Sequence, residues 1–174
     1  MIEFGINNEE NNEAPFLISI EEGEVNCVKF IVALPYKGEV GSKIDDTGIN
    51  ELNKLLVNAS PLYPNSSKKY EIIFEHYILY QTRNESYCSW DNYEIRNGKY
   101  FIIFSKSRML DFLSQITDCG KLEDGTAYPG EWKHFGIYCQ NHVIDIISCH
   151  EPTILRHFRE LWSGLDILRC IRRE

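Results

Sequence analysis

Apolar and polar residues alternate most clearly between Tyr70 and Thr82, and this alternation predicts one continuous β-strand. Every second residue from Tyr70 to Tyr80 is apolar except His76. A histidine within such a row is more often a core residue with a hydrogen-bond partner than a metal ligand. We therefore expect His76 to lie inside the protein.

Three further pairs of apolar runs predict β-hairpins. Their strands are 15–20 with 25–34, 86–96 with 99–105, and the two halves of the segment from Lys133 to Pro152. The first pair is joined by a turn at Gly23 and the second by Asn97-Gly98, a dipeptide typical of tight hairpin turns. The third has Gln140-Asn141 at its centre, which we interpret as a two-residue turn.

That turn predicts the register of the third hairpin, because residues equally distant from it face each other. On one face the predicted pairs are Cys139 with His142, Ile137 with Ile144, and Phe135 with Ile146. On the other face they are Tyr138 with Val143, Gly136 with Asp145, and His134 with Ile147. Apolar cross-strand pairs of this kind stabilise sheets, so a structural role accounts for most of the segment.

About three helices are predicted from apolar residues at helical spacing. Their apolar stripes are Ile49, Leu52, Leu55 and Leu56 after a cap at Asp46 or Thr47; Met109, Phe112, Leu113 and Ile116 after a cap at Ser105 or Ser107; and Ile154, Leu155, Phe158, Leu161, Trp162 and Leu165 after Pro152. The order of elements predicts a single α+β domain over residues 1–174, a mostly antiparallel sheet of hairpins with about three helices packed on it. Residues 1–14 are expected to be a mobile lead-in, and 118–132 a long loop.

The net charge of −8 changes the range of partners that we consider. Seven glutamates precede the first basic residue, Lys29. An acidic chain argues against nucleic acid as the main ligand, because phosphate binding requires lysine and arginine. The charge is compatible with a basic protein partner, and equally with a surface that only keeps the protein in solution.

The six cysteines do not suggest disulfides or a redox motif. The N-terminus lacks the basic and apolar regions of a signal peptide, so we expect a cytoplasmic protein whose thiols are reduced. The sequence has no C-x-x-C, and no window approaches the ~20 apolar residues of a membrane span, so no membrane association is expected.

Candidate chemistry is sparse, and no cofactor is predicted. Cys139 and His142 are predicted neighbours and could form a thiolate–imidazole pair, but Asp145 lies on the opposite face and could not orient the imidazole. A metal site from Cys139, His142, Cys149 and His150 is not expected, because adjacent strand residues point to opposite faces. Nucleotide-binding, zinc-protease and serine-hydrolase motifs are absent from the sequence.

The stretch S-W-D-N-Y-E (89–94) is the best candidate contact surface. Trp90 and Tyr93 are residue types that often dominate binding energy, and Asp91 and Glu94 could attract a basic partner. Glu123 and Asp124 in the 118–132 loop are further candidates. The competing interpretation is an ordinary hairpin with aromatic cross-strand pairs.

Two segments and the overall profile resemble the immunity proteins of bacterial toxin systems, including contact-dependent growth inhibition. The segments are S-Y-C-S-W-D-N-Y-E-I-R-N-G-K-Y-F-I-I-F-S-K-S-R-M-L-D-F-L and H-F-G-I-Y-C-Q-N-H-V-I-D-I-I-S. The resemblance implies a protein that binds a cognate toxin, often a basic nuclease, and blocks its active site or substrate surface. The alternative is a small enzyme that uses Cys139 with His142, or acids of the 118–132 loop.

Overall fold

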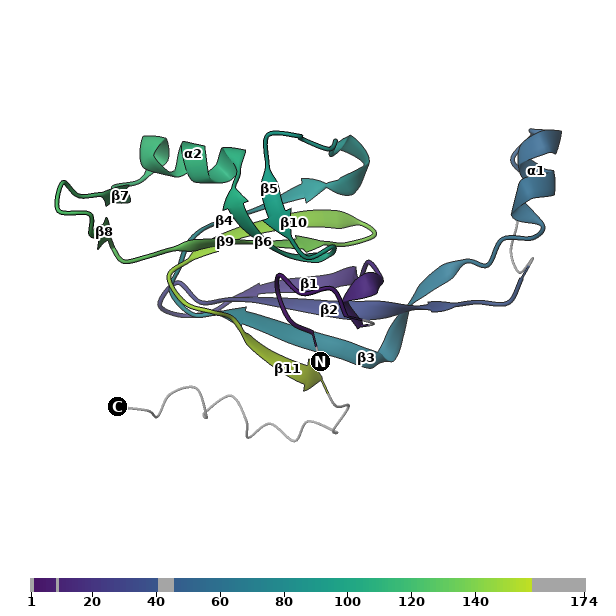
Figure 1. The fold of residues 1–174 in the computed structure, drawn as a ribbon. Coiled ribbons are helices and arrows are strands. Elements are labelled where there is room, and N and C mark those ends of the chain that lie inside the picture. Colours follow the sequence, from purple (N-terminus) through teal and green to yellow (C-terminus); the bar gives the residue numbers. More distant parts are fainter. Residues whose placement is uncertain (1, 9, 41–45, 158–174) are drawn as a thin grey trace.

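The computed structural model describes residues 2–8, 10–40 and 46–157, which form two antiparallel sheets and a small hairpin (Figure 1). Sheet A has the strand order β1 (Phe16–Glu22), β2 (Val28–Lys37), β3 (Leu62–Phe74) and β11 (Thr153–His157). Sheet B has the order β4 (Tyr77–Asn84), β10 (His142–Ser148), β9 (Lys133–Tyr138), β6 (Phe101–Lys106) and β5 (Ile95–Asn97). Strands β7 (Gly120–Lys121) and β8 (Ala127–Tyr128) form the hairpin, and the helices are α1 (Asn50–Leu56) and α2 (Arg108–Ile116). The expected mixed, mostly antiparallel architecture is confirmed, with two described helices instead of about three.

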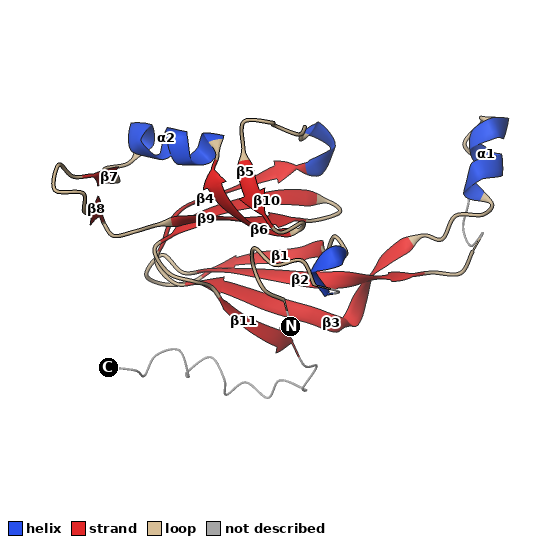
Figure 2. Ribbon diagram, in the orientation of Figure 1, coloured by secondary structure: helices blue, strands red, loops and turns tan. Residues whose placement is uncertain are grey.

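The main core lies between the two sheets, which face each other as layers in Figure 2. Sheet A contributes Phe30, Ile72 and Phe74, and sheet B contributes Phe135 and Ile146, all of them fully buried. Each sheet is apolar on the face that it turns to the other, and mutual burial of these faces is the main source of stability in such a fold.

The predicted single strand over Tyr70–Thr82 is wrong, because the chain turns at Glu75 and His76 and passes from sheet A into sheet B. His76 adopts the left-handed conformation, with φ of 57°, and its side chain is exposed, so its predicted core position is also wrong. A two-residue turn keeps the parity of the alternation. The sequence pattern therefore continues across the turn as if the strand were unbroken.

The hairpin predictions are largely confirmed. In β9 and β10, Ile137 pairs with Ile144 and Phe135 with Ile146, as predicted from the Gln140-Asn141 turn. The Asn97-Gly98 turn joins β5 to β6, but β5 covers only Ile95–Asn97. The preceding residues form a loop with a short 3₁₀ turn at Glu85–Tyr87 instead of the predicted strand.

Of the two helices in the described residues, only α2 packs against a sheet. Its cap is Ser107, whose hydroxyl accepts a hydrogen bond from the backbone N–H of Leu110 at 3.1 Å. Met109 and Leu113 are buried, whereas Phe112 and Ile116, predicted in the same stripe, are about half exposed. The buried stripe is narrower than predicted, because only Met109 and Leu113 belong to the buried cluster that α2 forms with Ile147 of the sheet.

Helix α1 is shorter than predicted and buries none of its residues. It lies at the end of an arm in which β2 and β3 extend beyond the core (Figure 1). The proposed cap residue Asp46 accepts hydrogen bonds from Gly48 and Asn53 instead of capping the first turn. A helix on an arm cannot cover the sheet, so this part of the predicted packing is wrong.

The predicted C-terminal helix is also wrong where the structure describes it. Residues Thr153–His157 form β11, which pairs with β3, and Ile154 packs against the core from there. The apolar positions of this short stretch fit a strand as well as a helix, and pairing with the open edge of β3 decides between them. The remainder of the prediction, from Phe158 onward, lies outside the described residues.

The N-terminal segment, expected to be a mobile lead-in over residues 1–14, contributes to the core. Ile2 and Phe4 are buried, and the Phe4 ring packs edge-on against Phe74, Phe101 and Phe135. The buried Asn11 amide donates to the carbonyl oxygen of Ile6 at 2.8 Å. These contacts hold the segment against core residues of both sheets.

Two further findings concern expectations from composition. The cysteines that the structure describes, 27, 88, 119, 139 and 149, are free thiols, and Cys170 lies outside the described residues. Neither α1 nor α2, the two helices of the described part of the chain, is long and apolar enough to cross a membrane.

We predict that Gly98→Ala destabilises the protein more than Gly125→Ala. Both glycines have positive φ, 87° and 85°, so both substitutions carry the backbone cost of about 1–2 kcal/mol. A Cβ at Gly98 would also lie 2.3 Å from the carbonyl oxygen of Phe101, whereas nothing lies within 4 Å at Gly125. The steric conflict adds about 1–3 kcal/mol. Urea unfolding of both variants measures the difference, and equal losses would contradict this geometry of the β5–β6 turn.

Candidate functional site

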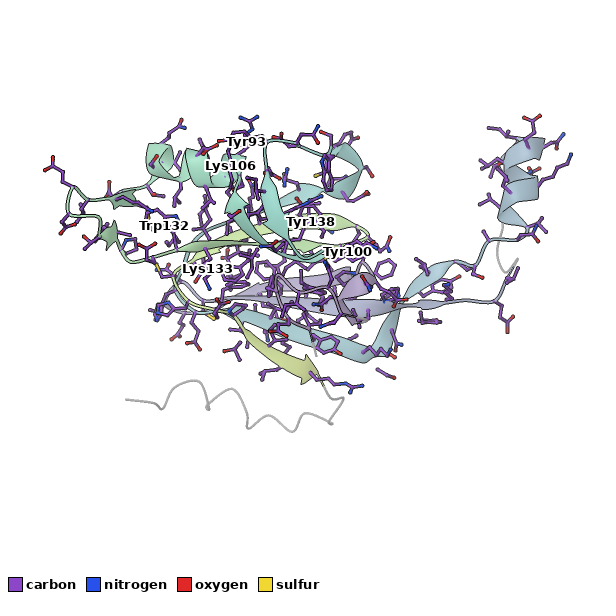
Figure 3. All side chains as sticks on the ribbon, viewed as in Figure 1. Tyr93, Tyr100, Lys106, Trp132, Lys133 and Tyr138 are labelled. Carbon is purple, nitrogen blue, oxygen red and sulfur yellow. The ribbon has the colours of Figure 1, made fainter. Side chains whose placement is uncertain are left out.

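The face of sheet B that points away from sheet A is covered at one end by α2 and hollowed at the other. The hollow has a volume of about 910 Å³, within the range of small-ligand sites. Its walls are the loop from Glu85 to Arg96 and the turn at Gly98–Tyr100, and its floor is the outward face of β4, β9 and β10. In Figure 3, Tyr138 lies at the end of β9 that borders the hollow, and Trp132 and Lys133 lie at the opposite end of this strand.

The floor is built around the carboxylate of Asp145, which is 2% exposed. Its Oδ2 accepts hydrogen bonds from Arg83 Nη2 at 2.7 Å and from Gln81 Nε2 at 3.2 Å. Its Oδ1 lies 3.1 Å from His134 Nε2. Gly136 faces Asp145 across the β9–β10 ladder. A Cβ at Gly136 would lie 2.9 Å from the Phe104 ring, so the absence of a side chain there makes space for Phe104 on this face.

A hydrogen-bonded chain connects Asp145 to the start of α2. Ser107 Oγ lies 2.7 Å from His134 Nδ1, and the His134 ring stacks on Phe104 with centroids 4.2 Å apart. The carboxylate only accepts and the Ser107 hydroxyl can donate, so in the neutral ring we assign the proton to Nε2. The three residue types match a hydrolytic triad, but Ser107 is completely buried and also caps α2. This chain therefore positions α2 on the sheet instead of presenting a nucleophile.

The network also affects acidity. Burial alone would raise the pKa of Asp145, but the hydrogen bonds from His134 and Gln81 and the charge of Arg83 outweigh it and hold the pKa below its ordinary value. Burial raises the pKa of Tyr138 to about 12, helped by the nearby carboxylates of Asp145 and Glu94. The Tyr138 phenol is therefore protonated at neutral pH and can donate a hydrogen bond.

One wall of the hollow is a stack of aromatic and guanidinium groups. The guanidinium carbon of Arg96 lies 3.6 Å from the centroid of the Trp90 ring and 5.4 Å from that of Tyr138. Trp90 is nevertheless 72% exposed, so most of the indole faces solvent. Cation–π contact with Arg96 restricts an aromatic side chain that would otherwise move freely at the surface.

A second cluster fixes the other side of the loop. Asp91 accepts a hydrogen bond from Arg108 Nε at 3.0 Å, and its other oxygen accepts the backbone N–H of Tyr93 at 2.9 Å. The Tyr93 ring contacts two cations, with Lys106 Nζ and the Arg108 guanidinium carbon each 3.9 Å from its centroid (Figure 3). The charge of Asp91 is thus neutralised by Arg108, and this pair connects the loop to α2.

The predicted contact residues fall into two places. Trp90, Asp91 and Glu94 line the hollow, and Tyr93 lies beside it in the cluster with Arg108. Glu123 and Asp124 lie in the β7–β8 turn, beyond the far end of α2 in Figure 1, and do not line the hollow. Asp124 is engaged locally, because its carboxylate accepts hydrogen bonds from the hydroxyl and the backbone of Thr126.

The alternative pair, Cys139 and His142, is adjacent as predicted, with the Cys139 N–H donating to the His142 carbonyl oxygen at 2.8 Å. Burial raises the pKa of the Cys139 thiol to about 12, so the reactive thiolate is scarce at neutral pH. Within the described residues, no cluster of three or more histidine, cysteine, aspartate or glutamate side chains has a geometry that could hold a metal ion.

Sequence reasoning missed the residues at the centre of the floor: Arg83, Gln81 and His134. One signal was present, because Asp145 interrupts the apolar strand V-I-D-I-I and a buried carboxylate requires partners. Gln81 is its direct neighbour on β4. That neighbour was not predicted, because β4 was interpreted as the continuation of β3.

Comparisons of the chain with protein-family models, with curated proteins and with solved structures give no significant match.

We predict that Asp145→Asn lowers the free energy of unfolding at pH 7 by about 3 kcal/mol, because it removes the buried charge that balances Arg83. The carboxylate's pKa is depressed in the folded state, so its stabilisation is present above the ordinary value of 3.8 and is lost as pH falls below it. Unfolding of the wild type and the variant should therefore converge in acid. Denaturant titrations from pH 7 to about pH 3 measure this.

Asp124→Asn is the matched control, because Asp124 also has a lowered pKa but is fully exposed. We expect it to leave unfolding at pH 7 nearly unchanged. A gap between wild type and Asp145→Asn that stays constant down to acid pH would contradict the role assigned to the carboxylate.

Proposed function

We propose that this chain is a cytoplasmic protein-binding inhibitor that neutralises a cognate toxin, with the hollow and its Glu85–Arg96 wall as the contact surface. The observation that carries the proposal is the exposure of Trp90 together with its support. A large aromatic side chain, 72% exposed, is held on the Arg96 guanidinium at the rim of a concave surface. Tryptophan, tyrosine and arginine in such settings contribute most to protein–protein binding energy.

The composition of the rim adds to this support. Tyr87, three residues before Trp90 in the sequence, is 89% exposed, and both side chains line the hollow. Rigid aromatic side chains lose little conformational entropy on binding, so an ordered rim favours affinity. A partner with one protruding side chain could place it in the hollow while its surrounding surface covers Trp90 and Tyr87.

The charge of the molecule favours a basic partner. The net charge is −8, whereas the hollow itself is lined by four basic and four acidic residues: Arg83, Arg96, Lys99 and Arg108, and Glu85, Asp91, Glu94 and Asp145. Long-range attraction then comes from the whole surface, and local contacts in the hollow provide selectivity. A basic nuclease-type toxin fits this distribution.

The rival enzyme hypothesis has less support. Cys139 is buried with a raised pKa, and the Ser107 hydroxyl is inaccessible. The acids of the 118–132 loop, which are Asp118, Glu123, Asp124 and Glu131, are all exposed, and none of them lines the hollow. None of these groups combines the activation and the access that a catalytic group needs.

We predict that a toxin captured by the wild-type protein is lost with Trp90→Ala. The source cells provide the lysate, and the three baits are wild type, Trp90→Ala and Tyr128→Ala. Tyr128 is the matched control, because it is a 58% exposed aromatic in β8, outside the hollow. Removal of an anchor typically costs at least about 2 kcal/mol, or about 30-fold in affinity.

The captured protein is then expressed alone and with each variant. We expect growth arrest by the partner alone, protection by the wild type and by Tyr128→Ala, and weaker protection by Trp90→Ala. A captured partner that does not harm cells would refute toxin neutralisation. Equal protection by all three variants would refute the assigned surface.

We further predict that association with this partner slows as salt rises. Glu85→Gln with Glu94→Gln should lower the association rate at low salt and have little effect at high salt, because counter-ions screen charges beyond about 10 Å. Asp91 is a poor choice for this test, since its removal would expose the Arg108 charge. Stopped-flow association at two salt concentrations measures the effect, and a salt-independent rate would exclude steering.

A further inference from the structure

Arg96 is the one arginine lining the hollow whose guanidinium has no carboxylate partner among the described residues. Arg83 pairs with Asp145 at 2.7 Å and Arg108 with Asp91 at 3.0 Å. The Arg96 side chain instead rests on the Trp90 ring, and no described side chain or backbone group accepts a hydrogen bond from it. Its N–H donors are therefore available to a ligand.

The stacking with Trp90 determines how those donors are presented. The guanidinium carbon lies 3.6 Å from the centroid of the Trp90 ring, and this contact with the face of the indole does not occupy any N–H donor of Arg96. The N–H groups lie in the plane of the guanidinium and form a fork that matches the two oxygens of a carboxylate. A stacked arginine also loses less conformational freedom on binding than a free one.

A second donor lies beside this fork. The Tyr138 phenol is within reach of the charges of both Arg96 and Arg83, and its raised pKa of about 12 keeps the hydroxyl protonated. The phenol therefore adds a neutral donor at the floor of the hollow, next to the cationic one in the wall. Two donors from different elements, β5 and β9, thus border the same space.

The surrounding charges limit the ligand to a single negative charge. Glu94 is two residues from Arg96 and its carboxylate also acts on Tyr138. With Arg83 and Asp145 balancing each other, Arg96 and Glu94 together leave no net positive charge near the phenol. A monoanion can gain the fork's two hydrogen bonds here, whereas a phosphate dianion meets additional repulsion from Glu94 in a hollow whose four basic and four acidic residues leave no net positive charge.

We infer that the hollow is a binding site for a carboxylate group, held by the in-plane N–H donors of Arg96 and by the Tyr138 hydroxyl. The group can belong to a small organic acid or to an aspartate or glutamate side chain of a polypeptide, because both present the same two oxygens. The site goes beyond toxin neutralisation and does not depend on it.

Titrations monitored by ¹H–¹⁵N NMR test the site, with the indole N–H of Trp90 and the Nε–H of Arg96 as reporters. The probes are benzoate, its neutral isostere benzamide, inorganic phosphate, and an end-blocked dipeptide with one aspartate. We expect saturable shifts of both reporters with benzoate, weaker binding of phosphate, and none of benzamide. Tighter binding of the dipeptide would identify a polypeptide as the source of the group, and tighter binding of benzoate a small acid.

Variants separate the carboxylate site from general charge effects. Arg96→Gln should weaken benzoate binding about tenfold or more, because it removes charge-assisted hydrogen bonds. Arg96→Lys keeps the charge but loses the fork, so it should lie between Arg96→Gln and the wild type. Lys121→Gln is the matched control, since it also removes one positive charge but lies exposed in β7, outside the hollow. Spectra that otherwise superimpose on the wild type establish that each variant is folded.

Glu94→Gln tests the sign of the electrostatic effect on binding. Removing a neighbouring negative charge should tighten benzoate binding about twofold to fivefold. Weaker benzoate binding in Glu94→Gln would overturn the inference, because a monoanion in this site should gain from the loss of the Glu94 charge. Equal shifts with benzamide, equal losses in Arg96→Gln and Lys121→Gln, stronger binding of phosphate, or no saturable shift would each overturn it as well.

Discussion

The burial of one carboxylate, Asp145, constrains the whole outer face of sheet B. An ionised group at 2% exposure is tolerated only where hydrogen bonds replace its hydration. Arg83 and Gln81 from β4 and His134 from β9 meet this requirement, so three neighbouring strands must stay in register for the charge to be satisfied. His134 extends the same constraint through Ser107 to the first turn of α2.

This arrangement also explains why a hollow exists at all. Polar side chains on the outer face of β9 and β10 cannot be covered by an apolar helix, and α2 accordingly lies over the part of the face that carries Ile147, against which its own Leu113 packs. The remainder of the face is bordered by a loop whose own structure depends on cation–π contacts and on the Asp91–Arg108 pair. Such a wall is polar at its edges and ordered without being buried, which is the character of a binding surface.

The electrostatics operate on two scales. Across the molecule the charge is strongly negative, but inside the hollow the charges of both signs balance, and half of them form ion pairs. Arg96 differs from the two other arginines of the hollow, because its guanidinium has no ion-pair partner among the described residues. Specific recognition in such a site depends on which donor is free and how it is oriented, more than on the net charge of the protein.

The sequence by itself determined the local elements whose register is specified by short-range patterns. The β9–β10 hairpin follows from its apolar pairs and turn, the Asn97-Gly98 turn from its dipeptide, and the start of α2 from the Ser107 cap. It also singled out the stretch that borders the hollow, through Trp90 and Glu94. Only the tertiary structure decided that β3 and β4 belong to different sheets, because the alternation is the same on both sides of a two-residue turn. It also decided that residues 153–157 form a strand, because their pairing with β3 selects a strand where the apolar pattern fits a helix equally well. The partners of Asp145 and the unpaired N–H groups of Arg96 likewise depend on contacts between residues far apart in the chain. Local sequence patterns carry no information about such contacts.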